Sequence, residues 1–160
     1  MNKKNQVRYL TVGASVCALY VALSFVNVPV FGAFQLRPAE ALTVLPVLTS
    51  AAIPGLFLGC LLANYLTGCI AIDICLGSIA TLLGAIGTRL LRRHPLLATV
   101  PPMLSNALII PPVLVFAYGV SDADLLLFLS VFIGELASCG LLGTLLLKAI
   151  KPISKRIFGE

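Results

Sequence analysis

Apolar residues form long, nearly unbroken runs along this chain, separated by short polar or glycine- and proline-containing stretches. Runs this long predict helices that cross a bilayer, which needs about 20 apolar residues per helix. The pattern predicts six helical segments, at residues 9–28, 38–53, 54–68, 70–91, 96–118 and 125–149. We expect a polar linker at residues 29–37 and a basic tail after the last segment.

Two of the six segments, 38–53 and 54–68, are shorter than a full membrane crossing. Pro38 suits the first turn of a helix, because proline lacks the N–H group that a first turn leaves unpaired. Either both segments span the membrane as short helices, or together they form a re-entrant hairpin. The two alternatives leave the later segments with the same orientation.

Composition supports lipid as the main solvent of this chain. Of its 160 residues, 59% are hydrophobic and 11% are charged, and the mean hydropathy is +1.07. A typical soluble domain carries about 25% charged residues, which it needs on its water-facing surface. We therefore expect one all-α integral membrane domain over residues 1–160, a bundle of six transmembrane helices.

The net charge of +5 does not indicate a nucleic-acid partner, because the basic residues cluster beside the apolar runs. Such clusters mark the cytoplasmic side of a membrane protein. They predict a multi-pass protein of the cell membrane with both termini in the cytoplasm and with Arg37 alone among the basic residues outside. The clusters are Lys3, Lys4 and Arg8; Arg89, Arg92 and Arg93; and Lys148, Lys151, Lys155 and Arg156.

The first segment carries a stripe of small residues, Ala14, Ala18 and Ala22, at a spacing that places them on one helix face. In lipid, small residues let helices approach closely, since apolar burial gives little driving force there. The stripe is therefore either a docking face for another subunit or part of the packing within the fold.

Polar residues inside the apolar runs are costly in a membrane and usually face the bundle interior or a cavity. The candidates are Glu40, Asn64, Asp73, Asn106 and Glu135. Asn106 and Glu135 each lie ten residues into consecutive antiparallel segments, at a depth of about 15 Å near the midplane. We expect them either to line one pocket or to form a buried structural pair.

Proline pairs at 101–102 and 111–112 bracket Ser105 and Asn106 in the fifth segment. Internal prolines free backbone carbonyls and kink helices, and such irregular backbone often lines a cavity in a membrane. The alternative is a simple kink. Broken helices commonly flank transporter binding sites.

The polar linker residues Gln35, Arg37 and Glu40 are expected near the outer face. Arg37 and Glu40 are close enough to pair, and Glu40 stands where a carboxylate suits the helix dipole. They form either a helix cap or the rim or lid of a pocket that faces incoming substrate.

Reactive chemistry has little support in this chain. The sequence contains one histidine and no phosphate-binding loop, nucleophile–base set or metal-ligand cluster. We expect no enzyme activity, no metal and no cofactor, so ATP-driven work would require another chain. The five cysteines are expected to be small buried hydrophobes, although Cys69 and Cys75 are close enough in sequence to pair.

Three stretches of the chain resemble the QueT family, substrate-specific (S) components of energy-coupling factor (ECF) transporters. They are residues 35–46 (QLRPAEALTVLP), 52–64 (AIPGLFLGCLLAN) and 73–82 (DICLGSIATL). The resemblance extends over nearly the whole chain. It implies that the alanine stripe docks on a transmembrane coupling subunit and that two cytoplasmic ATPases supply energy. It also implies that the first extracellular loop covers the pocket.

The substrate that the resemblance implies is a queuosine precursor, 7-aminomethyl-7-deazaguanine or a related deazapurine. A carboxylate can accept both N–H donors of its guanine-like edge, and Glu135 is the expected acceptor, with Asn106 beside it. The aminomethyl cation would favour Glu40 or Asp73. Tyr65, Phe34 or Tyr118 would stack on the ring; Arg37, Gln35, Asn64 and Ser105 complete the expected site.

Other functions remain open from the sequence. The same architecture would suit an S component for another vitamin or nucleobase. A stand-alone secondary transporter would need an ion relay, for which Glu135 is a candidate. A membrane-embedded enzyme is disfavoured because the chain lacks a reactive constellation.

Overall fold

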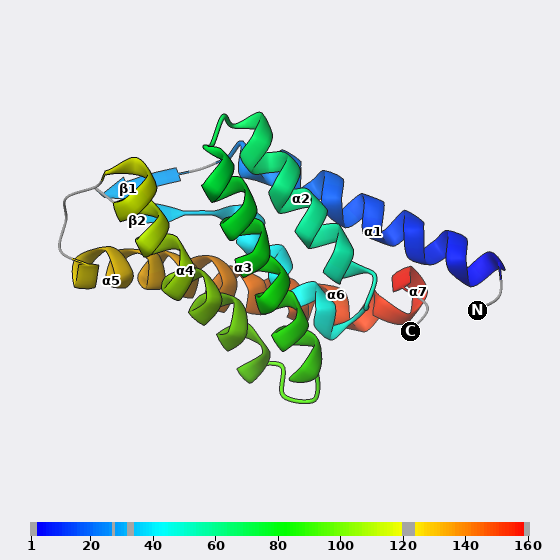
Figure 1. Cartoon of the computed structure of the whole chain (residues 1–160). Helices are drawn as coiled ribbons and strands as arrows, with labels where there is room; N and C mark the ends of the chain where they lie inside the picture. Colours follow the sequence, from blue (N-terminus) through cyan, green and yellow to red (C-terminus); the bar gives the residue numbers. More distant parts are fainter. Residues whose placement is uncertain (1–2, 27, 32–33, 120–123, 159–160) are drawn as a thin grey trace.

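The apolar runs form helices in the computed structural model, which describes residues 3–26, 28–31, 34–119 and 124–158 (Figure 1). Four helical stretches are long and apolar enough to cross a membrane, and the protein is an all-α membrane protein. They are α1 (Lys3–Ser24), α3 (Ala71–Leu90), Leu97–Tyr118 and Phe128–Phe158.

Two of these stretches contain several elements. The 3-10 turn η2 (Leu97–Thr99) leads into α4 (Val100–Tyr118). The last stretch begins within α5 (Asp124–Glu135) and passes through the π-helical turn η3 (Leu136–Leu142) into α6 (Gly143–Ile150). It ends with η4 (Lys151–Ile153) and α7 (Ser154–Phe158).

The two short segments are confirmed as short. The second is a 3-10 helix, η1 (Pro38–Val47), and the third is α2 (Ala52–Leu66). Ten residues of 3-10 helix rise about 20 Å, less than the ~30 Å hydrocarbon core. Every residue from Ala39 to Pro46 is buried, so protein rather than lipid surrounds this tight backbone.

A short hairpin occupies the expected polar linker. Strands β1 (Val28–Phe31) and β2 (Phe34–Leu36) pair antiparallel, with Val28 opposite Leu36. Sequence analysis did not predict these strands. The hairpin lies at the end of the molecule away from the chain termini, beside the start of α5 (Figure 1).

Glycines bring α1 and α2 into backbone contact. A Cβ atom on Gly55 would lie 2.5 Å from the carbonyl oxygen of Gly13. One turn along, a Cβ atom on Gly59 would lie 2.9 Å from Cβ of Tyr20. Close approach of this kind is how helices gain packing contacts in lipid. It fixes the position of Tyr20, which the structure buries completely.

The first proline pair does not interrupt a helix as expected. Pro101 and Pro102 lie in the first turn of α4, where the missing N–H groups cost no hydrogen bond. Their rings instead pack on α3, since Cβ atoms on Gly84 and Gly87 would lie 2.7 Å and 2.5 Å from Pro102 and Pro101. Only the second pair, 111–112, lies inside the helix.

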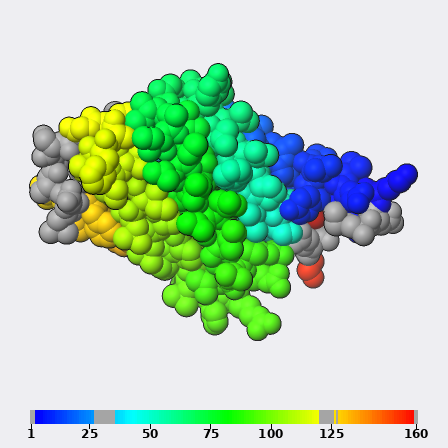
Figure 2. All heavy atoms as spheres, viewed as in Figure 1, coloured from blue at the N-terminus to red at the C-terminus, as the bar shows by residue number. Residues whose placement is uncertain are grey.

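The start of α1 and the helix α7 lie at the same end of the molecule (Figure 1). The Arg8 side chain donates to the carbonyl oxygens of Arg156 at 2.8 Å and Ile157 at 2.9 Å, which joins α1 to α7. Figure 2 shows α2, α3 and α4 side by side across one face. These helices expose large apolar side chains suited to lipid, among them Leu58, Leu62, Leu83, Ile86 and Leu108.

Candidate functional site

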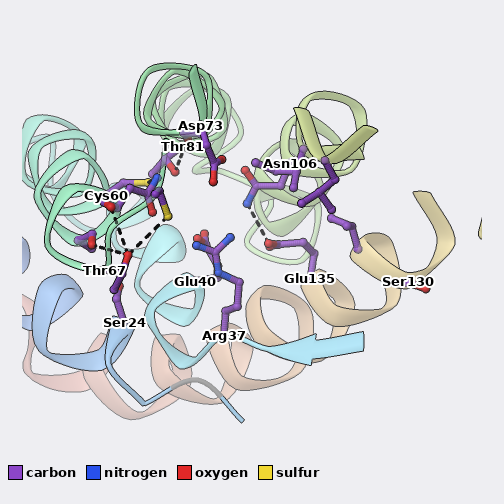
Figure 3. A pocket seen from close by; sticks show the side chains of 17 residues that line it. Ser24, Arg37, Glu40, Cys60, Thr67, Asp73, Thr81, Asn106, Ser130 and Glu135 are labelled. Carbon is purple, nitrogen blue, oxygen red and sulfur yellow. Dashed lines mark hydrogen bonds between the residues drawn. The ribbon is translucent and has the colours of Figure 1, made fainter. Parts of the chain in front are cut away.

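A cavity of about 370 Å³ lies inside the helical bundle (Figure 3). Small-molecule sites typically measure about 300–1,000 Å³, so the cavity suits a small ligand. Residues of α1, η1, α2, α3, α4 and α5, and of the segments just before η1 and after α2, line it. They are Ser24, Arg37, Glu40, Cys60, Ala63, Asn64, Thr67, Cys69, Asp73, Gly77, Thr81, Asn106, Ile110, Leu114, Ser130, Val131 and Glu135.

Helical periodicity explains which residues of each helix reach the cavity. Residues three or four apart share a helix face. On α3, that face presents Asp73, Gly77 and Thr81. On α2 and α4, the same spacing selects the sets Cys60, Asn64 and Thr67, and Asn106, Ile110 and Leu114. Each helix thus contributes one narrow stripe to the cavity and leaves its remaining faces for packing or lipid.

Glu135 and Asn106 form one wall. Nδ2 of Asn106 donates to Oε1 of Glu135 at 2.9 Å, and both side chains are buried (Figure 3). The other carboxylate oxygen, Oε2 of Glu135, is buried and has no hydrogen-bond partner within the described part of the chain. The two residues expected at equal depth therefore meet, and they both bond to each other and line the pocket.

Glu40 occupies another wall, at the start of η1. Its Oε1 accepts a hydrogen bond of 2.5 Å from the hydroxyl of Tyr20 on α1. Its Oε2 is buried, and none of the residues that the structure describes forms a hydrogen bond with it. An unpartnered buried polar atom is costly, and each such atom in a native structure requires an explanation. Two of them beside one cavity indicate groups that a ligand would satisfy.

Hydroxyl groups around the cavity already donate to their own helices. Ser24 donates to the carbonyl oxygen of Tyr20 at 2.8 Å, and Thr81 donates to that of Gly77 at 3.1 Å. Thr67 likewise donates to the carbonyl oxygen of Ala63 at 2.8 Å. Because a hydroxyl has one proton to donate, these side chains offer a ligand only acceptor lone pairs.

Acidic side chains outnumber basic ones among the described residues that line the cavity. Among its described lining residues, three carboxylates face one guanidinium: Glu40, Asp73 and Glu135 against Arg37. Figure 3 shows Arg37 extending from the end of β2 toward Glu40. The backbone N–H of Arg37 donates to Oγ of Ser138 at 3.0 Å, which holds the end of the hairpin against η3. A cationic, donor-rich ligand complements these walls best.

Six of the expected site residues line the cavity together: Glu135, Asn106, Glu40, Arg37, Asp73 and Asn64. Three others do not. Tyr65 is 68% exposed on the outer side of α2. Ser105 donates to the carbonyl oxygen of Pro102 at 3.2 Å. The hydroxyl of Tyr118 donates to Oδ2 of Asp73 at 3.0 Å beside the cavity. It also accepts a hydrogen bond of 3.3 Å from the backbone N–H of Ile70.

The side chains of Phe34 and Gln35 lie outside the part of the chain that the structure describes, although the backbone of both belongs to β2. The described lining residues include no aromatic ring, so the walls beside the polar groups are aliphatic, with Ile110, Leu114 and Val131. A flat ligand would lie against these side chains.

Several lining residues were missed by sequence analysis, including Cys60, Thr67, Gly77, Thr81 and Ser130. Their signal was helical spacing. Cys60 lies four residues before Asn64, and Gly77 and Thr81 follow Asp73 by four and eight. All five cysteines are free, Cys69 and Cys75 among them.

The alanine stripe lies on the outer side of α1. Ala14, Ala18 and Ala22 are all exposed, whereas the buried residues of this helix are Gly13, Val16 and Tyr20. The stripe therefore takes no part in packing within the described fold.

Comparison with known proteins identifies one family. The family model described as QueT transporter matches residues 10–152, which is most of the chain and all of the cavity lining. Neither a curated protein nor a solved structure matches the chain.

Proposed function

Because the chain belongs to the QueT transporter family, we propose that it is the subunit that captures a queuosine precursor, such as 7-aminomethyl-7-deazaguanine, from outside the cell. In this proposal it works as the S component of an ECF transporter. The family makes it a membrane transporter component rather than an enzyme. The substrate and the ECF partners go beyond the family match and rest on the cavity and on α1.

One observation carries the choice of substrate: the unpartnered, buried Oε2 atoms of Glu40 and Glu135 beside one cavity. Each needs a hydrogen-bond donor. A guanine-like edge offers adjacent N–H donors, and an aminomethyl group, cationic near neutral pH, offers more. Charge-assisted hydrogen bonds in a buried site are the strong kind. An anionic ligand would instead meet three carboxylates and one guanidinium.

We assign the guanine-like edge to the wall formed by Glu135 and Asn106. The Glu135 carboxylate accepts from the ring N–H and the exocyclic amine, while the Asn106 amide lies beside it to read the neighbouring carbonyl. We assign the ammonium group to Glu40 rather than to Asp73, because the buried Oε2 of Glu40 has no hydrogen-bond partner among the described residues. Aliphatic side chains of α4 and α5 cover the ring.

We assign energy coupling to other chains, which would dock on the exposed face of α1. Ala14, Ala18 and Ala22 offer a flat surface along which a helix of the coupling subunit can approach closely. Two cytoplasmic ATPases would act through that subunit. In this proposal both termini lie in the cytoplasm, and the contact between Arg8 and α7 supports their lying on the same side of the membrane.

The test is direct binding of 7-aminomethyl-7-deazaguanine to the purified, detergent-solubilised protein by isothermal titration calorimetry, with guanine and riboflavin as controls. We expect selective binding by this subunit alone. Tighter binding of guanine or riboflavin would move the substrate to another nucleobase or vitamin. A folded protein that binds none of the three would contradict the proposed substrate.

Uptake separates the ECF assignment from its rival. If the chain is an S component, liposomes should accumulate substrate only when the coupling subunit and the ATPases are also present. Accumulation by this chain alone, driven by an ion gradient, would establish a secondary transporter instead.

A further inference from the structure

Tyr20 does not line the cavity, yet it touches the group that does. Its side chain is completely buried between α1 and η1, and its hydroxyl donates to Oε1 of Glu40 at 2.5 Å. Among the described residues, the Tyr20 hydroxyl is the one hydrogen-bond donor on the Glu40 carboxylate. The phenol group of Tyr20, contributed by a different helix, therefore holds Oε1, while Arg37 extends toward the same carboxylate from the end of β2 (Figure 3).

Packing makes the phenol a rigid support. A Cβ atom on Gly59 would lie 2.9 Å from Cβ of Tyr20, so α2 packs closely against this part of α1. One turn further, Ser24 donates to the carbonyl oxygen of Tyr20 and lines the cavity itself. Tyr20 thus has little freedom to move without moving α1.

A carboxylate with two free oxygens can rotate and offer either one. When a fixed donor holds Oε1, the carboxylate can no longer rotate freely, and the direction of the unpartnered Oε2 is set. Preorganisation of this kind strengthens binding because the ligand does not have to order the acceptor. The unpartnered Oε2 beside the cavity is the expected result of such an arrangement.

We propose that Tyr20 is a positioning residue for substrate recognition: its hydroxyl holds Oε1 of Glu40 so that Oε2 accepts a hydrogen bond from the cationic group of the substrate. The inference rests on the proposed function, because it assigns the ammonium group to Glu40. It also gives α1 two roles. The outward side of this helix presents the alanine stripe, and its inward side positions a carboxylate of the pocket.

The experiment compares Tyr20→Phe with the wild type in binding two probes, 7-aminomethyl-7-deazaguanine and 7-deazaguanine, which lacks the cationic group. We expect the aminomethyl probe to lose about 10- to 100-fold in affinity, the effect of one hydrogen bond to a charged group. We expect 7-deazaguanine to lose less than about threefold. Tyr9→Phe is the matched control, because Tyr9 lies on the same helix, donates to the carbonyl oxygen of Ser50 at 3.5 Å and is not among the described residues that line the cavity.

The same substitution in a Glu40→Gln background closes a double-mutant cycle. If Tyr20 acts through Glu40, adding Tyr20→Phe to that variant costs less than about threefold, because the carboxylate is already gone. This comparison also applies where 7-deazaguanine binds too weakly to measure. Thermal melting of each purified variant checks that it is folded.

Three outcomes would overturn the inference: wild-type affinity in Tyr20→Phe, equal losses for both probes, or an equal cost in both backgrounds. The last two would mean that Tyr20 only supports the fold. Failure of the wild type to bind either probe would contradict the proposed substrate instead, which keeps the two failures distinct.

Discussion

The two sides of helix α1 differ sharply in chemistry. The inward side buries Gly13, Val16 and Tyr20, and its last turn brings Ser24 to the cavity. The outward side exposes Ala14, Ala18 and Ala22, which have no functional groups and little bulk. The inward side can select a ligand through directed hydrogen bonds, whereas the alanine stripe can offer only shape.

This difference separates recognition from coupling within a single helix. Changes on the cavity side should alter binding by the isolated subunit. Changes on the outward side should leave binding intact and appear only when the partner subunits are present. The following predictions test this separation, beginning with the largest expected effect on binding.

Replacing Glu135 with Gln should have the largest effect. The amide keeps the shape but cannot accept two N–H donors with full negative charge. We expect 7-aminomethyl-7-deazaguanine to bind at least about 100-fold more weakly, the loss of two charge-assisted hydrogen bonds. Calorimetric titration measures the change. Wild-type affinity would show that Glu135 does not accept the guanine-like edge.

Glu40→Gln should weaken the same ligand about 10- to 100-fold, since one charged acceptor is lost. The loss should be much smaller for 7-deazaguanine, measured by the same titration. If Glu40→Gln reduced the affinity of both ligands equally, the ammonium group would have to be assigned elsewhere, and Asp73 would be the next residue to test.

Gly77→Val tests the cavity by filling it. A Cβ atom at this position would already lie 3.0 Å from Nδ2 of Asn64 and 3.8 Å from Cδ1 of Ile110. The larger side chain should crowd the ligand and weaken binding about tenfold, as overpacking typically costs about 1–3 kcal/mol. Leu76→Val on the same helix is the control, because Leu76 does not line the cavity and is 38% exposed.

Unchanged affinity in Gly77→Val would place the ligand away from α3. Retained affinity together with a lower melting temperature would locate the strain in the fold and not in the site.

Ala18→Leu should change binding least, by less than about twofold, because its side chain lies on the outward side of α1. Uptake in liposomes with the coupling and ATPase subunits should nevertheless fall strongly, since a leucine would hold the partner helix away. Ala71→Leu, at an exposed alanine of α3, is the matched control. Normal uptake by Ala18→Leu would remove the stripe from the docking surface.

The local pattern of apolar and polar residues predicted much of the fold and part of the site. The apolar runs located all the helical segments, including the two short ones, because segment length and polarity are local properties. Counting ten residues into two antiparallel segments also located the contact between Asn106 and Glu135. Depth in a membrane can be read from sequence because a helix rises by a constant amount per residue.

That reasoning could not predict how each helix is rotated about its axis or how the helices pack against one another. Tyr65 was expected in the pocket with its neighbour Asn64, yet adjacent residues point about 100° apart on a helix and Tyr65 is exposed. Pro101 and Pro102 were expected to break a helix, but they begin one and pack against glycines of α3.

The sequence by itself determined that this chain is a membrane protein of short and long helices with costly polar groups inside. Solvent preference and helical rise act residue by residue, so no knowledge of neighbours is needed. Only the tertiary structure decided that η1 is a buried 3-10 helix and that Tyr20 meets Glu40. That contact joins separate helices, and close packing at glycines sets how they meet.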